Sequence, residues 1–66
     1  MDIVLNGEPR AVRAELSLAA LLDELGLAGK RLAVEVNRDI VPRGEHVTRV
    51  LRDGDRVEII HAIGGG

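Results

Sequence analysis

One segment of this chain has the periodicity of a helix, and the segments on either side of it have the character of strands. The helical stripe is made of four leucines at positions i, i+3, i+4 and i+7: Leu18, Leu21, Leu22 and Leu25. Ser17 is placed to cap the first turn, and Gly26 to end the helix in the left-handed conformation, with Leu27 folding back against it. A single helix can cover only one face of a sheet, so we expect the other face to be open to solvent or to a partner.

Short β-prone segments predict two strands before this helix and three after it. Residues 3–5 and 10–14 form the first pair, joined through Asn6-Gly7, which favours the type I′ turn of a tight hairpin. Within this pair we expect Val12 to point inward and Pro9 to lie at a strand start or sheet edge. The later strands are predicted at residues 32–36, 40–41 and 56–60.

The alternation within the later strands assigns their faces. Val57 and Ile59 are expected to point inward and Ile60 outward, and a turn at residues 53–55 precedes this last strand. Residues 43–52 are mainly polar and predict a loop with one helical turn. The sequence therefore predicts an α+β fold, with one mixed sheet of four to five strands covered on one face by a single main helix.

Composition limits both the core and the partners. The 66 residues make one small domain, and with no cysteine and no aromatic residue its core must be aliphatic and free of disulfides. The net charge of -2, with both signs interspersed, argues against nucleic-acid binding. No apolar run approaches the roughly 18 residues of a membrane span, and the N-terminus does not resemble a signal peptide. We expect a cytoplasmic protein that binds neither nucleic acid nor membrane.

No set of residues within the chain predicts catalysis. His46 is expected in an exposed loop and His61 beside the chain end, and the two lack the spacing of a metal site. A turn and a strand exterior account for Asp53, Asp55 and Glu58. The phosphate-binding Gly-Lys-Ser/Thr motif is missing. We therefore expect no catalytic residue, no metal and no bound cofactor, and a carrier, substrate or adaptor rather than an enzyme.

The last residues of the sequence are unusual. They are Ile63, Gly64, Gly65 and Gly66. Glycines lack Cβ, so such a segment fits a narrow channel and suits a carboxylate that another protein must reach. The alternative is that these glycines have no function, as is common at chain ends. We expect a folded domain at residues 1–62 and a flexible tail at residues 63–66.

Several segments together resemble the ThiS family of sulfur carriers in thiamine biosynthesis, over nearly the full length. They are the Asn6-Gly7 hairpin, the leucine helix, Ala-Val-Glu-Val-Asn at 33–37, Ile-Val-Pro-Arg at 40–43, Asp-Gly-Asp at 53–55 and the final Gly-Gly. Each segment is weak alone, but the Asn-x-x-Ile-Val-Pro-Arg stretch followed by Asp-Gly-Asp and Gly-Gly is specific. The resemblance implies a β-grasp fold, as in ubiquitin.

The resemblance also implies a mechanism. A ubiquitin-activating-type adenylyltransferase would use Mg-ATP to adenylate the Gly66 carboxylate. A persulfide sulfur donor would convert it to a thiocarboxylate for thiazole synthase. In this interpretation Ile63, Gly64 and Gly65 occupy the partner's channel. Ala33 and Ile60 contribute to a partner surface, although Ile60 alone is equally well explained as a scattered apolar surface residue.

Three other functions remain open at this stage. The small sulfur-carrier subunit of molybdopterin synthase shares the tail chemistry, but that family tends to end in Pro-Pro-x-Ser-Gly-Gly, which residues 61–66 do not match. Gly64 departs slightly from the thiamine family as well, where a small residue such as Ala often stands. The second open function is that of a ubiquitin-like protein modifier. The third is that of an interaction module with an inert tail.

Overall fold

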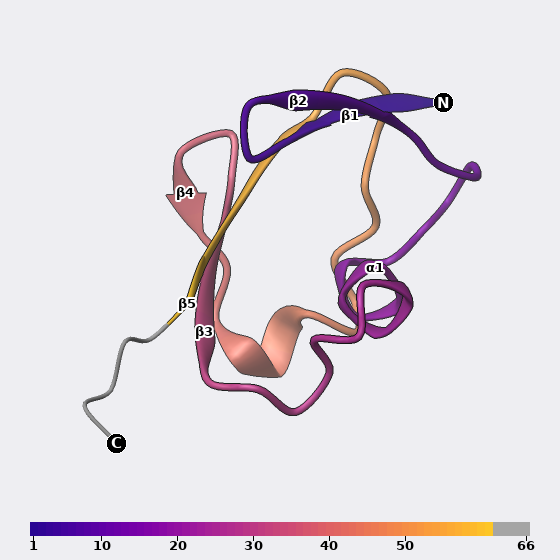
Figure 1. The fold of residues 1–66 in the computed structure, drawn as a ribbon. Helices are drawn as coiled ribbons and strands as arrows, with labels where there is room; N and C mark the ends of the chain where they lie inside the picture. The colour runs from indigo at the N-terminus through magenta and orange to yellow at the C-terminus, as the bar shows by residue number, and fades with distance from the viewer. Residues whose placement is uncertain (62–66) are drawn as a thin grey trace.

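The computed structural model describes residues 1–61 and contains a five-stranded sheet with an α-helix lying on one side of it (Figure 1). In chain order the elements are β1 (Asp2–Leu5), β2 (Glu8–Ala11), α1 (Leu18–Glu24), β3 (Leu32–Val36), β4 (Asp39–Ile40), the 3₁₀ turn η1 (Arg43–Glu45) and β5 (Arg56–His61). This architecture confirms the predicted α+β class, with one mixed sheet and one main helix.

The two ends of the described chain meet in the middle of the sheet. The strand order is β2-β1-β5-β3-β4. β1 and β5 pair in parallel, with Val4 opposite Arg56, and the other neighbours pair antiparallel. β5 therefore joins the β1–β2 hairpin to the β3–β4 hairpin.

The first hairpin has the predicted turn but a shifted second strand. Asn6 and Gly7 have φ of 49° and 84°, the left-handed pair that a type I′ turn requires. Because this turn has two residues, Leu5 pairs directly with Glu8, and β2 begins there rather than at residue 10. Pro9 lies on the edge strand, where its missing N–H is tolerated. Val12 follows β2 and packs, half-buried, against the core.

Helix α1 begins and ends as its sequence predicts. The Ser17 side chain accepts a hydrogen bond from the Ala20 amide, at 3.1 Å. At the other end Gly26 has a φ of 74°. The Leu27 amide donates to the Leu22 carbonyl at 2.8 Å, and the Gly26 amide donates to the Asp23 carbonyl at 3.0 Å. These two bonds form a Schellman motif, so the helix termination is specified locally.

The core between α1 and the sheet is entirely aliphatic, as the composition requires. Its buried members are Ile3, Leu16, Leu18, Leu21, Leu22, Val34, Val36, Val41, Leu51, Val57 and Ile59. Leu16 and Leu51 lie outside the predicted helix and strands. The Leu51 amide donates to the Leu16 carbonyl at 2.8 Å, which brings the segment before α1 against the segment before β5.

Candidate functional site

The predicted reactive segment follows β5 directly. β5 carries the chain to His61, whose side chain is exposed. Ile63, Gly64, Gly65 and Gly66 lie outside the described residues, as does the predicted domain boundary after residue 62. Their assignment stays a prediction, and the described part of the site is the sheet beside the end of β5.

The two residues predicted for a partner surface are cross-strand neighbours. Ala33 on β3 is paired with Ile60 on β5, and both are exposed. The adjacent pair, Val34 and Ile59, is buried in the core. Side chains alternate along a strand, so Ala33 and Ile60 point away from α1. The structure thus brings them together on the open face of the sheet, while their role stays a prediction.

The next row of the open face combines an apolar residue with two carboxylates. Glu35 on β3 is paired with Glu58 on β5 and, on its other side, with Ile40 on β4. Ile40 is 70% exposed and Ile60 50% exposed. We call these residues the mixed patch: Ala33, Glu35, Ile40, Glu58 and Ile60. Ile40 was not predicted to belong to this surface, although a two-residue turn at 37–38 places it opposite Glu35.

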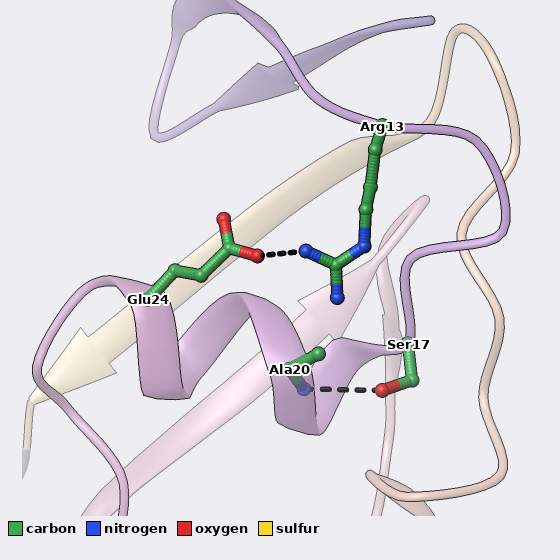
Figure 2. A network of polar contacts seen from close by, with 4 residues as sticks. All are labelled: Arg13, Ser17, Ala20 and Glu24. Carbon is green, nitrogen blue, oxygen red and sulfur yellow. Dashed lines mark hydrogen bonds and ion pairs between the residues drawn. The ribbon is translucent and has the colours of Figure 1, made fainter.

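The N-terminus of α1 has no amide left to bind an anion. The Leu18 amide donates to the Arg49 carbonyl and the Ala19 amide to the His46 carbonyl. The Ala20 amide donates to Ser17 Oγ (Figure 2). Figure 2 also shows Arg13 reaching Glu24 in the last turn, at 2.6 Å, where both side chains are exposed. The amides of the first turn are thus used to hold the helix in place and form no binding site.

The prediction that His46 lies in an exposed loop is wrong. Its side chain is buried, with 7% exposed, and Nε2 lies 3.0 Å from the Val41 carbonyl. The His46 amide closes η1 by donating to the Arg43 carbonyl, and its own carbonyl accepts from Ala19. The imidazole thus contacts the residue that follows β4, and the backbone carbonyl of His46 holds the N-terminus of α1.

The aspartates before β5 accept structural hydrogen bonds and do not form a cluster. Asp53 Oδ1 accepts from the Asp2 amide at 2.8 Å. Asp55 is buried, with 9% exposed, and its carboxylate accepts from the Arg52 amide at 2.8 Å and from Asn37 Nδ2 at 3.0 Å. Within residues 1–61, no group of three potential metal-ligating side chains is formed.

The bond between Asn37 and Asp55 explains two of the segments that carry the family resemblance. Asn37 begins the β3–β4 turn, with a φ of 52°. Its side-chain Oδ1 accepts from the Arg56 backbone amide at 2.9 Å. Its backbone amide donates to the Arg56 carbonyl at 2.7 Å. The Asn-x-x-Ile-Val-Pro-Arg and Asp-Gly-Asp segments are thus fastened to each other, which positions the start of β5.

Neither a small-molecule site nor a membrane span is evident in the described part of the chain. A depression of about 180 Å³ beside the first hairpin is lined by Leu5, Glu8, Pro9 and Arg10, and it is smaller than the roughly 300–1,000 Å³ of typical ligand pockets. No described helix has the length and apolarity to cross a bilayer.

Comparison with known proteins gives matches along the whole chain. The sulfur carrier protein ThiS of Thermus thermophilus is 40% identical over 62 residues, which is 94% of this chain and 95% of that protein. ThiS of Escherichia coli is 29% identical over the whole of both chains. A thiazole synthase of Paramagnetospirillum magneticum is 44% identical over all 66 residues, and the chain spans only 20% of that protein's length.

A solved structure confirms the β-grasp fold. The crystal structure of the thiamine biosynthesis protein ThiS from Geobacter metallireducens superimposes with a TM-score of 0.87, at 32% identity, and both chains are covered completely. The ThiS family model itself matches residues 3–66. The matches with the ThiS family and its sulfur carrier proteins support the prediction that this domain is a carrier. The chain belongs to the ThiS family, the sulfur carriers of thiamine biosynthesis.

Proposed function

We propose that this chain carries sulfur for thiazole formation as a thiocarboxylate on Gly66. The observation that carries the proposal is the end-to-end match with a sulfur carrier, which covers all of this chain and all of the Escherichia coli protein. The match with the family model likewise runs through Gly66. Both matches include Gly66, and a glycine has no side chain beside its carbonyl carbon to hinder attack on it.

The chemistry accounts for the need for an activating enzyme. A carboxylate resists nucleophiles because it is negatively charged and has no good leaving group. Attack of the Gly66 carboxylate on the α-phosphorus of ATP releases pyrophosphate and gives an acyl adenylate. The sulfur of a cysteine persulfide then displaces AMP, and a thiol cleaves the resulting S–S bond to leave the thiocarboxylate and a disulfide. Mg-ATP belongs to the ubiquitin-activating-type adenylyltransferase, and the proposed reaction takes place in the cytoplasm, where ATP is available.

The folded domain delivers this end to its partners. Ile63, Gly64 and Gly65 would pass through the enzyme's channel, where backbone amides can bind a terminal carboxylate. Ala33 and Ile60 would contact the protein around the channel, because they lie together beside the end of β5. Thiazole synthase is proposed as the acceptor, and the match of the whole chain to a fifth of two thiazole synthases supports it.

The test is ATP–pyrophosphate exchange with the adenylyltransferase of the same cells. Deleting Gly66, or adding one alanine after it, is expected to abolish exchange, because the carboxylate then lies one residue short of the α-phosphate or one residue beyond it. Gly65→Val is also expected to abolish exchange, because the valine side chain does not fit the enzyme's narrow channel. Far-UV circular dichroism must remain that of the wild type, since the residues of the described core are unchanged. Unchanged exchange by the deletion variant would refute the proposal.

The intact mass of the protein from its native cells separates the alternatives. A thiocarboxylate has one oxygen replaced by sulfur, whereas a protein modifier is found joined to lysines of other proteins. Complementation of a thiamine auxotroph, and not of a molybdenum-cofactor auxotroph, distinguishes this carrier from the molybdopterin synthase subunit. An inert tail predicts full complementation after loss of Gly65 and Gly66.

A further inference from the structure

Few groups in this sequence can attack an activated carbonyl. Of its nine lysine and arginine residues only Lys30 is a lysine, and the sequence has no cysteine. A guanidinium remains protonated and is not a nucleophile, whereas a lysine amine becomes one when it loses its proton. If the Gly66 carbonyl is activated as proposed, Lys30 is therefore the one side-chain amine of the chain that can react with it.

Lys30 lies in the loop between α1 and β3, close to the end of β5. Leu32, two residues later, begins β3 and is paired with His61, the last residue of β5. Figure 1 shows the start of β3 beside the end of β5. Two residues span at most about 7 Å and paired Cα atoms lie about 5.5 Å apart, so at most about 13 Å separates the Cα atoms of Lys30 and His61.

The loop holds the backbone of Lys30 and leaves its amine unengaged. The Lys30 backbone amide donates to the Leu27 carbonyl at 3.1 Å, and the Lys30 carbonyl accepts from the Arg43 guanidinium at 2.8 Å. The Lys30 side chain is exposed, and it forms no ion pair within residues 1–61. The amine is therefore kept near the end of β5 and is accessible there.

The chain beyond His61 is long enough for its last carbonyl to meet this amine. Five residues follow His61, and at roughly 3.3–3.6 Å per extended residue they reach at most about 17 Å. This reach exceeds the separation of about 13 Å before the length of the lysine side chain is added. Covalent geometry therefore allows Gly66 to reach Lys30 whenever no enzyme holds the chain end.

The other amine of the chain, at the N-terminus, is out of reach. The Met1 ammonium donates to the Val12 carbonyl at 2.8 Å. Because β1 and β5 are parallel with Val4 opposite Arg56, Met1 lies at the end of the sheet where β5 begins. About eight residues of strand rise, roughly 26 Å, separate that end from His61. Position alone therefore singles out Lys30.

We propose that Lys30 is the site at which the activated carrier acylates itself when sulfur does not take the acyl group. This inference rests on the proposed function. The neutral Nζ attacks the Gly66 carbonyl carbon, the bond from that carbon to the phosphate oxygen breaks, and AMP leaves with the bonding electrons. The nitrogen then gives its extra proton to water. The product is an internal amide, one water lighter than the free protein and without a terminal carboxylate to activate again.

The test incubates the whole protein with the adenylyltransferase of the same cells and Mg-ATP, without a sulfur donor. Intact mass is expected to show a monomer one water lighter that forms only when ATP is present. After digestion, the peptide that contains Lys30 should be joined to the C-terminal peptide. Hydroxylamine should leave this amide intact, whereas it cleaves an ester or an acyl imidazole, such as one on His61. The species is expected to be lost in Lys30→Arg.

A matched control moves the lysine without changing composition or charge. K30R/R10K places it on the edge strand β2, where Arg10 is exposed and paired with Ile3. That position lies level with the start of β5, roughly 20 Å along the sheet from His61, so no amide is expected there. ATP–pyrophosphate exchange should be the same for the wild type and both variants, because Lys30 acts only after activation.

Each outcome bears on a different claim. If the wild type exchanges pyrophosphate but forms no ATP-dependent amide at Lys30, the self-acylation inference is overturned and activation of Gly66 stands. If K30R/R10K forms the amide equally well, or if the amide joins two chains, proximity within one chain does not decide the reaction and the inference is also overturned. Absence of exchange with the wild type would overturn the proposed function itself.

Discussion

Replacing Asn37 with alanine is expected to lower the free energy of unfolding by about 3 kcal/mol. The side chain donates to the Asp55 carboxylate at 3.0 Å and accepts from the Arg56 amide at 2.9 Å. A hydrogen bond to a charged group contributes about 1.5 kcal/mol and a neutral one about 1. The φ of 52° adds about 1 kcal/mol, because alanine is strained there and asparagine tolerates it. Solvation of the exposed turn reduces the sum slightly.

Two further variants separate these contributions. Asn37→Gly loses the same hydrogen bonds but adopts a positive φ freely, so its loss should be about 1 kcal/mol smaller. A double-mutant cycle with Asp55→Ala should give a coupling of about 1–1.5 kcal/mol between the two side chains. Urea denaturation followed by far-UV circular dichroism measures all of them, since the chain has no tryptophan or tyrosine. The reasoning fails if Asn37→Ala unfolds at the wild-type midpoint, or if glycine is as damaging as alanine.

The other variants use the same denaturation assay. Arg38→Gly should stabilise by about 1 kcal/mol, because Arg38 has a φ of 71°; a loss of stability would contradict this. Ser17→Ala should destabilise by about 1 kcal/mol through loss of the helix cap, and a neutral result would show that water replaces it. Leu21→Ala should destabilise by about 3 kcal/mol, as a fully buried leucine does. Arg13→Ala should change stability by less than about 0.5 kcal/mol, because its ion pair is exposed; a larger loss would show that this pair fixes the helix.

Local chemistry made parts of the fold predictable. The limits of α1 follow from Ser17 and Gly26, which act on amides and carbonyls within one turn. The first hairpin follows from Asn6-Gly7, whose left-handed pair is a property of those residues. The start of β2 was misplaced because pairing across the turn, rather than residue preference, decides where that strand begins.

Long-range contacts were not predictable in the same way. Buried His46 accepts at its backbone carbonyl from the distant Ala19 amide, and buried Asp55 accepts from an asparagine 18 residues away. Nothing next to either residue in the sequence indicates these partners. For the candidate site, alternation correctly placed Ile60 on the outer face, whereas its pairing with Ala33 depends on the register of β3 against β5.

The central position of β5 has a consequence for how the domain acquires its fold. Both hairpins form from neighbouring residues, but the sheet closes only when β5 enters between them, and the Asn6–Ile59 bond spans 53 positions of sequence. Such distant pairing slows folding. On the ribosome, the two hairpins must wait for β5 to be synthesised. The glycine segment follows β5, so it leaves the ribosome only after every strand that the domain needs has been made.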